Sequence, residues 1–417
     1  MEQRKFDPFA LPLLLLVLSV LINYIDRGNL SIAAPLLKEE LGISASQLGI
    51  LLSAFFWTYT ALLFVCGFFI DCFDVNRVLA LGFLLWSLAT AATGIVHGFA
   101  MLLVMRLMLG VGESVAFPCY CKILACHLPE HRRGFANGAI IAGMKCGPVV
   151  GTLGAGFLIT KYGWRPVFVG IGLLSLAWLP GWMRVMPRDA ASTHSGVSPR
   201  VIDILQQRSF WATAAGGFCL AYPLYFMVTW LPFYLAHEQH LSMRDMVNVA
   251  ALYYTIDAAS ALATGWTTDF WIGRGLSASN IRKSAMALGW TMAAIGFLGC
   301  SSAGSHSYLA WLMVTGVGCG IGNSGIWAFS QTLAGPQAVG RWVGLQNGFA
   351  NLAGVVGPAL TGFIVDWTGH FRAAFVITAG ACLLSGVSWV FLLGRLEQVV
   401  WTRGAESDLA GAVPEII

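Results

Sequence analysis

The chain has 417 residues, of which 57% are hydrophobic and 11% are charged, and its mean hydropathy is +0.72. An ordinary soluble domain cannot bury so much apolar surface, so the composition excludes a soluble enzyme and indicates a polytopic membrane protein. The formal net charge is only +4, and the lysines and arginines are too few and too scattered for nucleic-acid binding.

Apolar windows of about 20 residues, the length that crosses a bilayer, recur along the chain. Arg4 and Lys5 precede the first window, but no small-residue cleavage site follows it, so we expect a retained helix and not a signal peptide. The twelve windows lie at approximately 10–36, 45–70, 77–97, 99–126, 135–160, 165–186, 209–236, 246–268, 284–303, 306–334, 344–366 and 372–394.

The longest polar interruption, 187–208, falls midway and is interpreted as a linker. We therefore predict an all-α integral membrane protein with twelve transmembrane helices in two six-helix bundles. The predicted units are an N-terminal bundle (1–186), a cytoplasmic linker (187–208), a C-terminal bundle (209–396) and a cytoplasmic tail (397–417).

The two predicted bundles carry matching marks, which predicts a pseudo-two-fold relation between them. Gly67-x-x-x-Asp71 in the first half corresponds to Gly265-x-x-x-Asp269 in the second. Asn137-Gly138 with Gly147-Pro148 corresponds to Asn347-Gly348 with Gly357-Pro358 at one constant offset. Such halves suit a transporter that rocks around a central site.

The basic residues predict the orientation of the chain. With the N-terminus inside, sixteen lysines and arginines fall in inside segments and five in outside segments, a positive-inside bias that places both termini in the cytoplasm. The five outside residues are Lys38, Lys161, Arg165, Arg244 and Arg372.

The ten cysteines and many glycines are interpreted as packing residues. Most cysteines fall in apolar stretches and none forms a C-x-x-C pair, so we expect no disulfide and no metal. No phosphate-binding loop of the type G-x-x-x-x-G-K-[ST] occurs, so ATP hydrolysis is not indicated. We expect no cofactor.

Two acids and two bases lie inside predicted helices, where an ionised group costs about 2.5–3.5 kcal/mol on insertion scales. Asp26 and Arg27 are neighbours in the first helix and point about 100° apart, so each needs a partner from another helix. Arg106 and Glu113 in the fourth helix are seven residues apart and share a face. The four side chains predict a polar network that is either a solute pathway or a static link between helices.

The twelve-helix pattern resembles the major facilitator superfamily. Its signature between helices 2 and 3 resembles Gly67-Phe-Phe-Ile-Asp71-Cys-Phe-Asp74-Val-Asn-Arg77, although Cys72 and Asp74 replace the usual Arg and Gly. The glycine-rich signature of helix 5 resembles Gly143-x-x-x-Gly147-Pro148-x-x-Gly151.

Within that superfamily, strings along nearly the whole chain resemble the anion:cation symporter branch, which includes bacterial sugar-acid transporters. The strings are Asn23-Tyr-Ile-Asp26-Arg27-Gly-Asn29; Arg106-x-x-x-Gly110-x-x-Glu113-x-x-x-x-Pro118; Tyr225-Phe-Met-Val-Thr-Trp230-Leu-Pro232-Phe-Tyr-Leu235; Arg274-Gly-Leu-Ser; and Gly340-x-x-x-Gly-Leu-Gln-Asn347 with Gly354-x-x-Gly357-Pro358.

The resemblance implies a role for each charged residue of the network. Asp26 and Glu113 would bind protons, Arg27 would bind the substrate carboxylate, and Arg106 would hold Asp26. Desolvation raises the pKa of a carboxyl group while a nearby Arg lowers it, so such a network can titrate near ambient pH. Protonated acids would release Arg27 for the anion.

Lys145 in helix 5 and Asp257 in helix 8 depart from the usual pattern of the branch. Helices 5 and 8 meet across the halves in this superfamily, so the two residues would form an ion pair that breaks as the halves rock. Alternatively, Lys145 is a second cationic group for a dianion or a hydroxyl-rich acid. A third reading is that Lys145 snorkels to the cytoplasmic side and Asp257 is solvated.

Three uncharged side chains complete the predicted substrate site. Tyr59 occupies the position of a substrate-contacting Tyr in the sugar-acid branch, and core packing is the alternative. Gln331 belongs to a polar and aromatic cluster in helix 10 that suits a hydroxylated substrate. Asn351 in helix 11 points hydrogen-bonding groups into the bundle, where amides also join helices.

These features predict a proton-coupled symporter that imports a small organic anion, first of all a sugar acid, by alternating access. The alternatives are an anion exchanger or facilitator without proton coupling, and a transporter-like membrane receptor for a solute. The sequence contains no set of nucleophile and base that would indicate an enzyme. We expect a monomer, multi-pass in a cell membrane, with a bacterial inner membrane as the expected location.

Overall fold

The computed structural model describes residues 9–66, 73–128, 130–186, 199–302, 307–323, 326–394, 397–399 and 401. Within these residues the chain is helical and contains no strand. Eleven of the described helices are long and apolar enough to cross a membrane. The predicted class, an all-α integral membrane protein, is confirmed.

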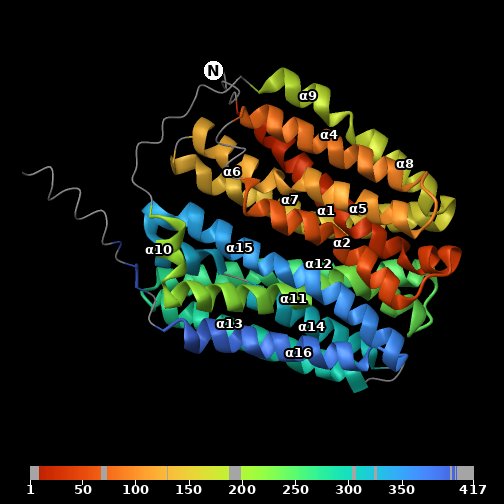
Figure 1. The fold of residues 1–417 in the computed structure, drawn as a ribbon. Coiled ribbons are helices and arrows are strands. Elements are labelled where there is room, and N and C mark those ends of the chain that lie inside the picture. Colours follow the sequence, from red (N-terminus) through yellow and green to blue (C-terminus); the bar gives the residue numbers. More distant parts are fainter. Residues whose placement is uncertain are drawn as a thin grey trace, which may run out of the picture.

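The first half of the chain forms one bundle, drawn in red to yellow-green in Figure 1. Its fourth and sixth predicted spans are each divided into two consecutive helices, α5 with α6 and α8 with α9. The helices are α1 (Ala10–Leu41), α2 (Ala45–Leu63), α4 (Val75–Thr93), α5 (Phe99–Ser114), α6 (Ala116–His127), α7 (Glu130–Tyr162), α8 (Trp164–Ser175) and α9 (Trp178–Val185).

The second half forms a second bundle, drawn in green to blue beside the first (Figure 1). Its helices are α10 (Val201–Leu205), α11 (Arg208–His237), α12 (Met243–Gly273), α13 (Ala278–Ser302), α14 (Tyr308–Asn323), α15 (Ile326–Thr368), α16 (Arg372–Val387) and the π-helical turn η1 (Ser388–Leu392).

The tenth predicted span, 306–334, differs most from the structure. It is shared between α14 and the first turns of α15, and residues 324–325 between them lie outside the described chain. α14 has 16 residues, which by itself is shorter than a typical spanning helix. Inside α15, Gly335 has a φ of 65°, so the chain bends there and two helices meet.

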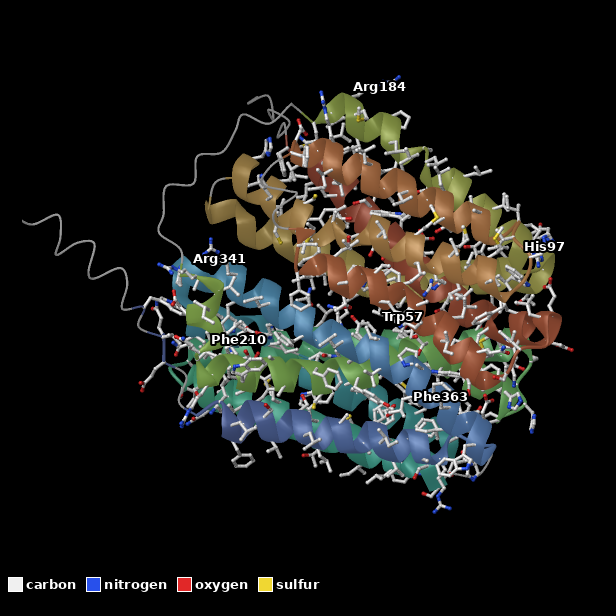
Figure 2. The ribbon with its side chains drawn as sticks, viewed as in Figure 1. Trp57, His97, Arg184, Phe210, Arg341 and Phe363 are labelled. Atoms are coloured by element: carbon white, nitrogen blue, oxygen red, sulfur yellow. The ribbon has the colours of Figure 1, made fainter. Side chains whose placement is uncertain are left out.

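The predicted linker, 187–208, contains a short helix. Residues 187–198 lie outside the described chain, and α10 follows with Ile204 fully buried. Beside it, Arg341 of α15 donates a hydrogen bond to the carbonyl of Pro199. Figure 2 shows Arg341 at this end of the molecule and His97 at the opposite end.

The end that carries the turn between α1 and α2 is called the Gly42 end. α1 stops there because Gly42 adopts a φ of 60°, which a residue without a side chain tolerates best. Ser44 then begins α2 by a capping box with Gln47, each side chain bonding the backbone N–H of the other residue. The sequence Gly-Ile-Ser thus turns the chain sharply back into the bundle.

The two halves pack together mainly through three helix pairs: α2 with α15, α7 with α12, and α1 with α11. Near the Gly42 end, α2 and α15 touch backbone to backbone. A Cβ atom at Gly49 would lie 2.5 Å from the carbonyl oxygen of Pro358 and 3.1 Å from the Cα of Gly362. Only a glycine fits this contact, because no room is left for a side chain.

Asp366, near the end of α15, caps the start of α2 across the two halves. Its Oδ1 accepts the N–H of Ala45 at 2.8 Å and its Oδ2 accepts the N–H of Ser46 at 2.7 Å. The first N–H groups of a helix have no partner within the helix, and a negative charge there is stabilising. The C-terminal half therefore contributes directly to the first turn of α2.

Replacing Asp366 with Ala is expected to speed hydrogen–deuterium exchange at the amides of Ala45 and Ser46 by about fivefold, as the loss of a cap worth about 1 kcal/mol predicts. Mass spectrometry of the peptide that covers the start of α2 measures the change. Asp245→Ala is the matched control, because Asp245 accepts only from Ser242 at the start of its own helix. Unchanged exchange in Asp366→Ala would show that this cap does not stabilise the start of α2.

Candidate functional site

Arg27 and Glu113 form a buried ion pair between α1 and α5. The Nε of Arg27 lies 2.7 Å from the Oε2 of Glu113, and the two side chains are 10% and 0% exposed. This distance is typical of a charge-assisted hydrogen bond. Removing one partner of such a buried pair leaves an uncompensated charge and costs about 3–5 kcal/mol.

Aromatic rings surround the guanidinium group of Arg27. Its Cζ lies 4.7 Å from the ring centre of Tyr24, 5.1 Å from that of Phe55 and 4.6 Å from that of Tyr59. Each ring face attracts the cation. Tyr59 is 4% exposed, so the predicted substrate residue belongs to the wall around Arg27.

Asp26 and Arg106 are buried beside this pair, at 2% and 5% exposure. The expected direct contact between them is not among the ion pairs of the described chain. The Oδ1 of Asp26 accepts a long hydrogen bond of 3.4 Å from Asn29. Arg106 instead lies 5.3 Å from the ring centre of Phe55, which takes the position beside the guanidinium.

Lys145 and Asp257 form the ion pair that the sequence offered as one of three readings. The Nζ of Lys145 in α7 lies 3.4 Å from the Oδ2 of Asp257 in α12, so the contact joins the two halves. The side chains are 30% and 12% exposed. The Oδ1 of Asp257 has no hydrogen-bond partner.

Asn351 lies on the C-terminal side of the interface between the halves. Its Oδ1 accepts the hydroxyl of Tyr225 at 2.5 Å, and its Nδ2 donates to the carbonyl of Asn347 at 2.7 Å. The ring of Tyr225 lies 4.4 Å from that of Phe56 on α2, next to Phe55. Asn351 is therefore connected to the aromatic wall around Arg27 through Tyr225 and Phe56, whose ring lies 4.9 Å from that of Phe55.

Gln331, the remaining predicted substrate residue, has a side chain outside the described part of the molecule. Its neighbour Ser330 is described and donates its hydroxyl to the Oε1 of Gln346 at 2.6 Å. Gln346 is 2% exposed and was not singled out from the sequence. The available signal was only that Gln346 directly precedes Asn347, because it lies five residues, or about 1.4 turns, before Asn351 and so on another side of the helix.

Tyr24 and Phe55 are the other site residues that sequence reasoning missed. Tyr24 precedes Arg27 by three residues and Phe55 precedes Tyr59 by four, so each pair shares a helix face. That spacing was a usable signal for the rings around the cation. Among the described residues, no three His, Cys, Asp or Glu side chains gather as a metal ion would require.

Paired bundles with buried opposite charges near the contact between them define a class of membrane protein, the secondary transporter. The chain matches the family model described as Major Facilitator Superfamily over residues 16–278 and 249–414. It belongs to this family of transporters, so it is a multi-pass membrane transporter and not an enzyme.

Several curated relatives are named as anion or sugar-acid transporters, which confirms the resemblance found in the helix strings. The chain is 29% identical over 405 residues to a hexuronate transporter of Bacillus subtilis (strain 168), covering 92% of this chain and 94% of that one. It is 31% identical over 399 residues to the chloroplastic ascorbate transporter of Arabidopsis thaliana, covering 89% and 72%.

A solved structure shows the same fold. The crystal structure of a bacterial homologue of the human lysosomal transporter Spinster, in an inward-facing and unoccupied conformation, matches with a TM-score of 0.78. The match covers 94% of this chain and 98% of that one at 16% sequence identity. The two-bundle architecture is thus that of known members of the family.

Proposed function

We propose that this chain is a proton-coupled symporter that imports a small organic anion, in particular a sugar acid, by alternating access of its two halves. In this proposal the protein acts as a monomer in a bacterial inner membrane. Both termini are cytoplasmic, as the bias of basic residues favours. The Gly42 end then faces outward.

The observation that carries the proposal is the buried pair of Arg27 and Glu113. A guanidinium that is 10% exposed needs a negative partner, and Glu113 supplies it at 2.7 Å. When Glu113 binds a proton, Arg27 loses that partner. A substrate carboxylate then replaces it, because the fork of a guanidinium matches a carboxylate.

Asp26 gives the site a second position for a proton. It is 2% exposed and is the chain neighbour of Arg27. A carboxyl group there can bind a proton, and in that form it can donate a hydrogen bond. Arg106, equally buried, is the positive charge that compensates Asp26 when the proton leaves.

The other predicted residues take supporting roles. Tyr59 contacts both Arg27 and the bound acid, and Asn351 with Gln331 contributes hydrogen bonds from the C-terminal half to hydroxyl groups. Sugar acids carry a carboxylate at one end and hydroxyls along the chain, which matches a cation in one half and amides in the other. The hexuronate transporter among the relatives supports this substrate class.

Uptake by purified protein in proteoliposomes tests the proposal. An inward proton gradient is expected to drive accumulation of a radiolabelled hexuronate or aldonate above its outside concentration, and collapse of the gradient by an ionophore is expected to stop it. Uptake that only equilibrates the substrate, with or without the ionophore, would favour an exchanger or facilitator. Saturable binding without any flux would favour a membrane receptor.

A further inference from the structure

Lys145 on α7 and Arg27 on α1 lie on opposite sides of the contact between Gly147 and Tyr24, and are separated in depth by about 7.5 Å at 1.5 Å per residue. The backbone of Gly147 in α7 packs directly against Tyr24 in α1, where a Cβ atom would overlap the Cβ of Tyr24. Lys145 precedes Gly147 by two residues, so it lies about 3 Å further along α7 and points about 200° away. It therefore faces α12 and not α1.

The pair of Lys145 and Asp257 is poorly formed. Its single contact of 3.4 Å is longer than the 2.7–2.9 Å that is usual for an ammonium and a carboxylate. The Lys145 side chain is 30% exposed, whereas Arg27 is 10% exposed. A negative group that approaches from the pathway can thus reach Lys145 and compete with Asp257.

Asp257 can bond to water when Lys145 is not paired with it. It borders a cavity of about 20 Å³, and its Oδ1 has no hydrogen-bond partner. The same cavity is lined by Asn323 and Tyr254. A space of this size holds about one water molecule, which can bond a carboxylate oxygen and a neighbouring amide.

We propose that Lys145 binds the second acidic group of a dianionic sugar acid, and that Asp257 occupies its position while the site is empty. The inference rests on the proposed function, with Arg27 holding the first carboxylate. A full negative charge is needed, because a hydroxyl group is too weak an acceptor to displace a carboxylate from an ammonium. Binding then opens the contact between α7 and α12, which joins the two halves.

The test compares two six-carbon acids that differ at one end, gluconate with one carboxylate and glucarate with two. Equilibrium binding to the full-length purified protein is measured by isothermal titration calorimetry. The wild type is expected to bind glucarate at least about tenfold more tightly. Lys145→Gln is expected to remove this preference, which is a loss of about 1.4 kcal/mol of binding free energy for each tenfold. Gluconate has only one carboxylate, so its binding to Lys145→Gln is expected to stay within about twofold of its binding to the wild type.

Asp257→Asn removes the internal competitor and is expected to strengthen glucarate binding severalfold. The double variant Lys145→Gln/Asp257→Asn leaves no unpaired charge, so it controls for folding. It is expected to bind glucarate as weakly as Lys145→Gln alone. Lys161→Gln, on an exposed lysine of the same helix, is the matched control and is expected to behave as the wild type.

Two outcomes would overturn the proposal. One is a glucarate-to-gluconate preference that Lys145→Gln leaves unchanged. The other is recovery of glucarate binding in the double variant, which would give the ion pair a purely structural role. Failure of the proposed function looks different, because the wild type would then bind neither acid, or Arg27→Ala would bind both normally.

Discussion

Replacing Arg27 with Ala is expected to reduce sugar-acid uptake by about 10- to 150-fold. A charge-assisted hydrogen bond to a carboxylate contributes about 1.5–3 kcal/mol. Among the described residues, no other cation lies as close to the rings of Tyr24, Phe55 and Tyr59. Arg27→Lys retains the charge but loses the forked guanidinium and its flat contact with the rings. Its uptake is therefore expected to lie between that of the wild type and that of Arg27→Ala. Initial rates in proteoliposomes measure both.

The single variant leaves Glu113 buried without a partner, which threatens folding by itself. Arg27→Ala/Glu113→Gln removes that charge and is compared with Glu113→Gln alone, with size-exclusion profiles as the check on folding. Arg165→Ala is the matched control, because Arg165 pairs with Glu40 at 2.9 Å and the two side chains are 23% and 43% exposed. Equal substrate binding by the double variant and Glu113→Gln would contradict the assignment of Arg27.

Replacing Glu113 with Gln is expected to separate binding from proton coupling. The amide resembles the protonated acid, so Arg27 is free of its counter-ion at every pH. In the wild type, anion binding should strengthen as the pH falls, because protonation of Glu113 removes the competing charge. In Glu113→Gln, binding should be strong and nearly independent of pH.

The same variant should exchange substrate across the membrane but should not accumulate it against a gradient. Counterflow of labelled substrate and proton-driven uptake, measured on one preparation, distinguish the two abilities. Glu40→Gln serves as the control, since Glu40 is a half-exposed carboxylate at the Gly42 end. Intact proton-driven accumulation in both Glu113→Gln and Asp26→Asn would contradict the assignment of these two acids as the proton-binding groups.

Much of the fold follows from the sequence because a bilayer imposes one strong rule. Every spanning segment must be apolar and about 20 residues long, so the windows find the helices. The windows also end one span at 334, where Gly335 has a positive φ inside α15, but they do not indicate that 306–334 is shared between α14 and α15. The charges in helices 1, 4, 5 and 8 were equally visible, because each is costly in an apolar stretch.

Pairing of those charges was harder to predict, since it depends on distances between helices. The sequence placed Arg106 against Asp26, and in the structure the guanidinium of Arg106 also lies 5.3 Å from the ring centre of Phe55 of α2. An apolar residue in an apolar helix carries no signal that its ring will lie beside a charge from another helix. Asp366 is a similar case, because its partners are backbone N–H groups that every residue except proline possesses.

The start of α2 has a built-in redundancy. Ser44 and Gln47 cap the helix from its own half, and Asp366 caps it from the other. If the halves separate at the Gly42 end, water replaces the carboxylate while the local cap persists. α2 can therefore separate from α15 and return to it without unfolding. The contact at Asp366 breaks and re-forms while the secondary structure on either side stays intact.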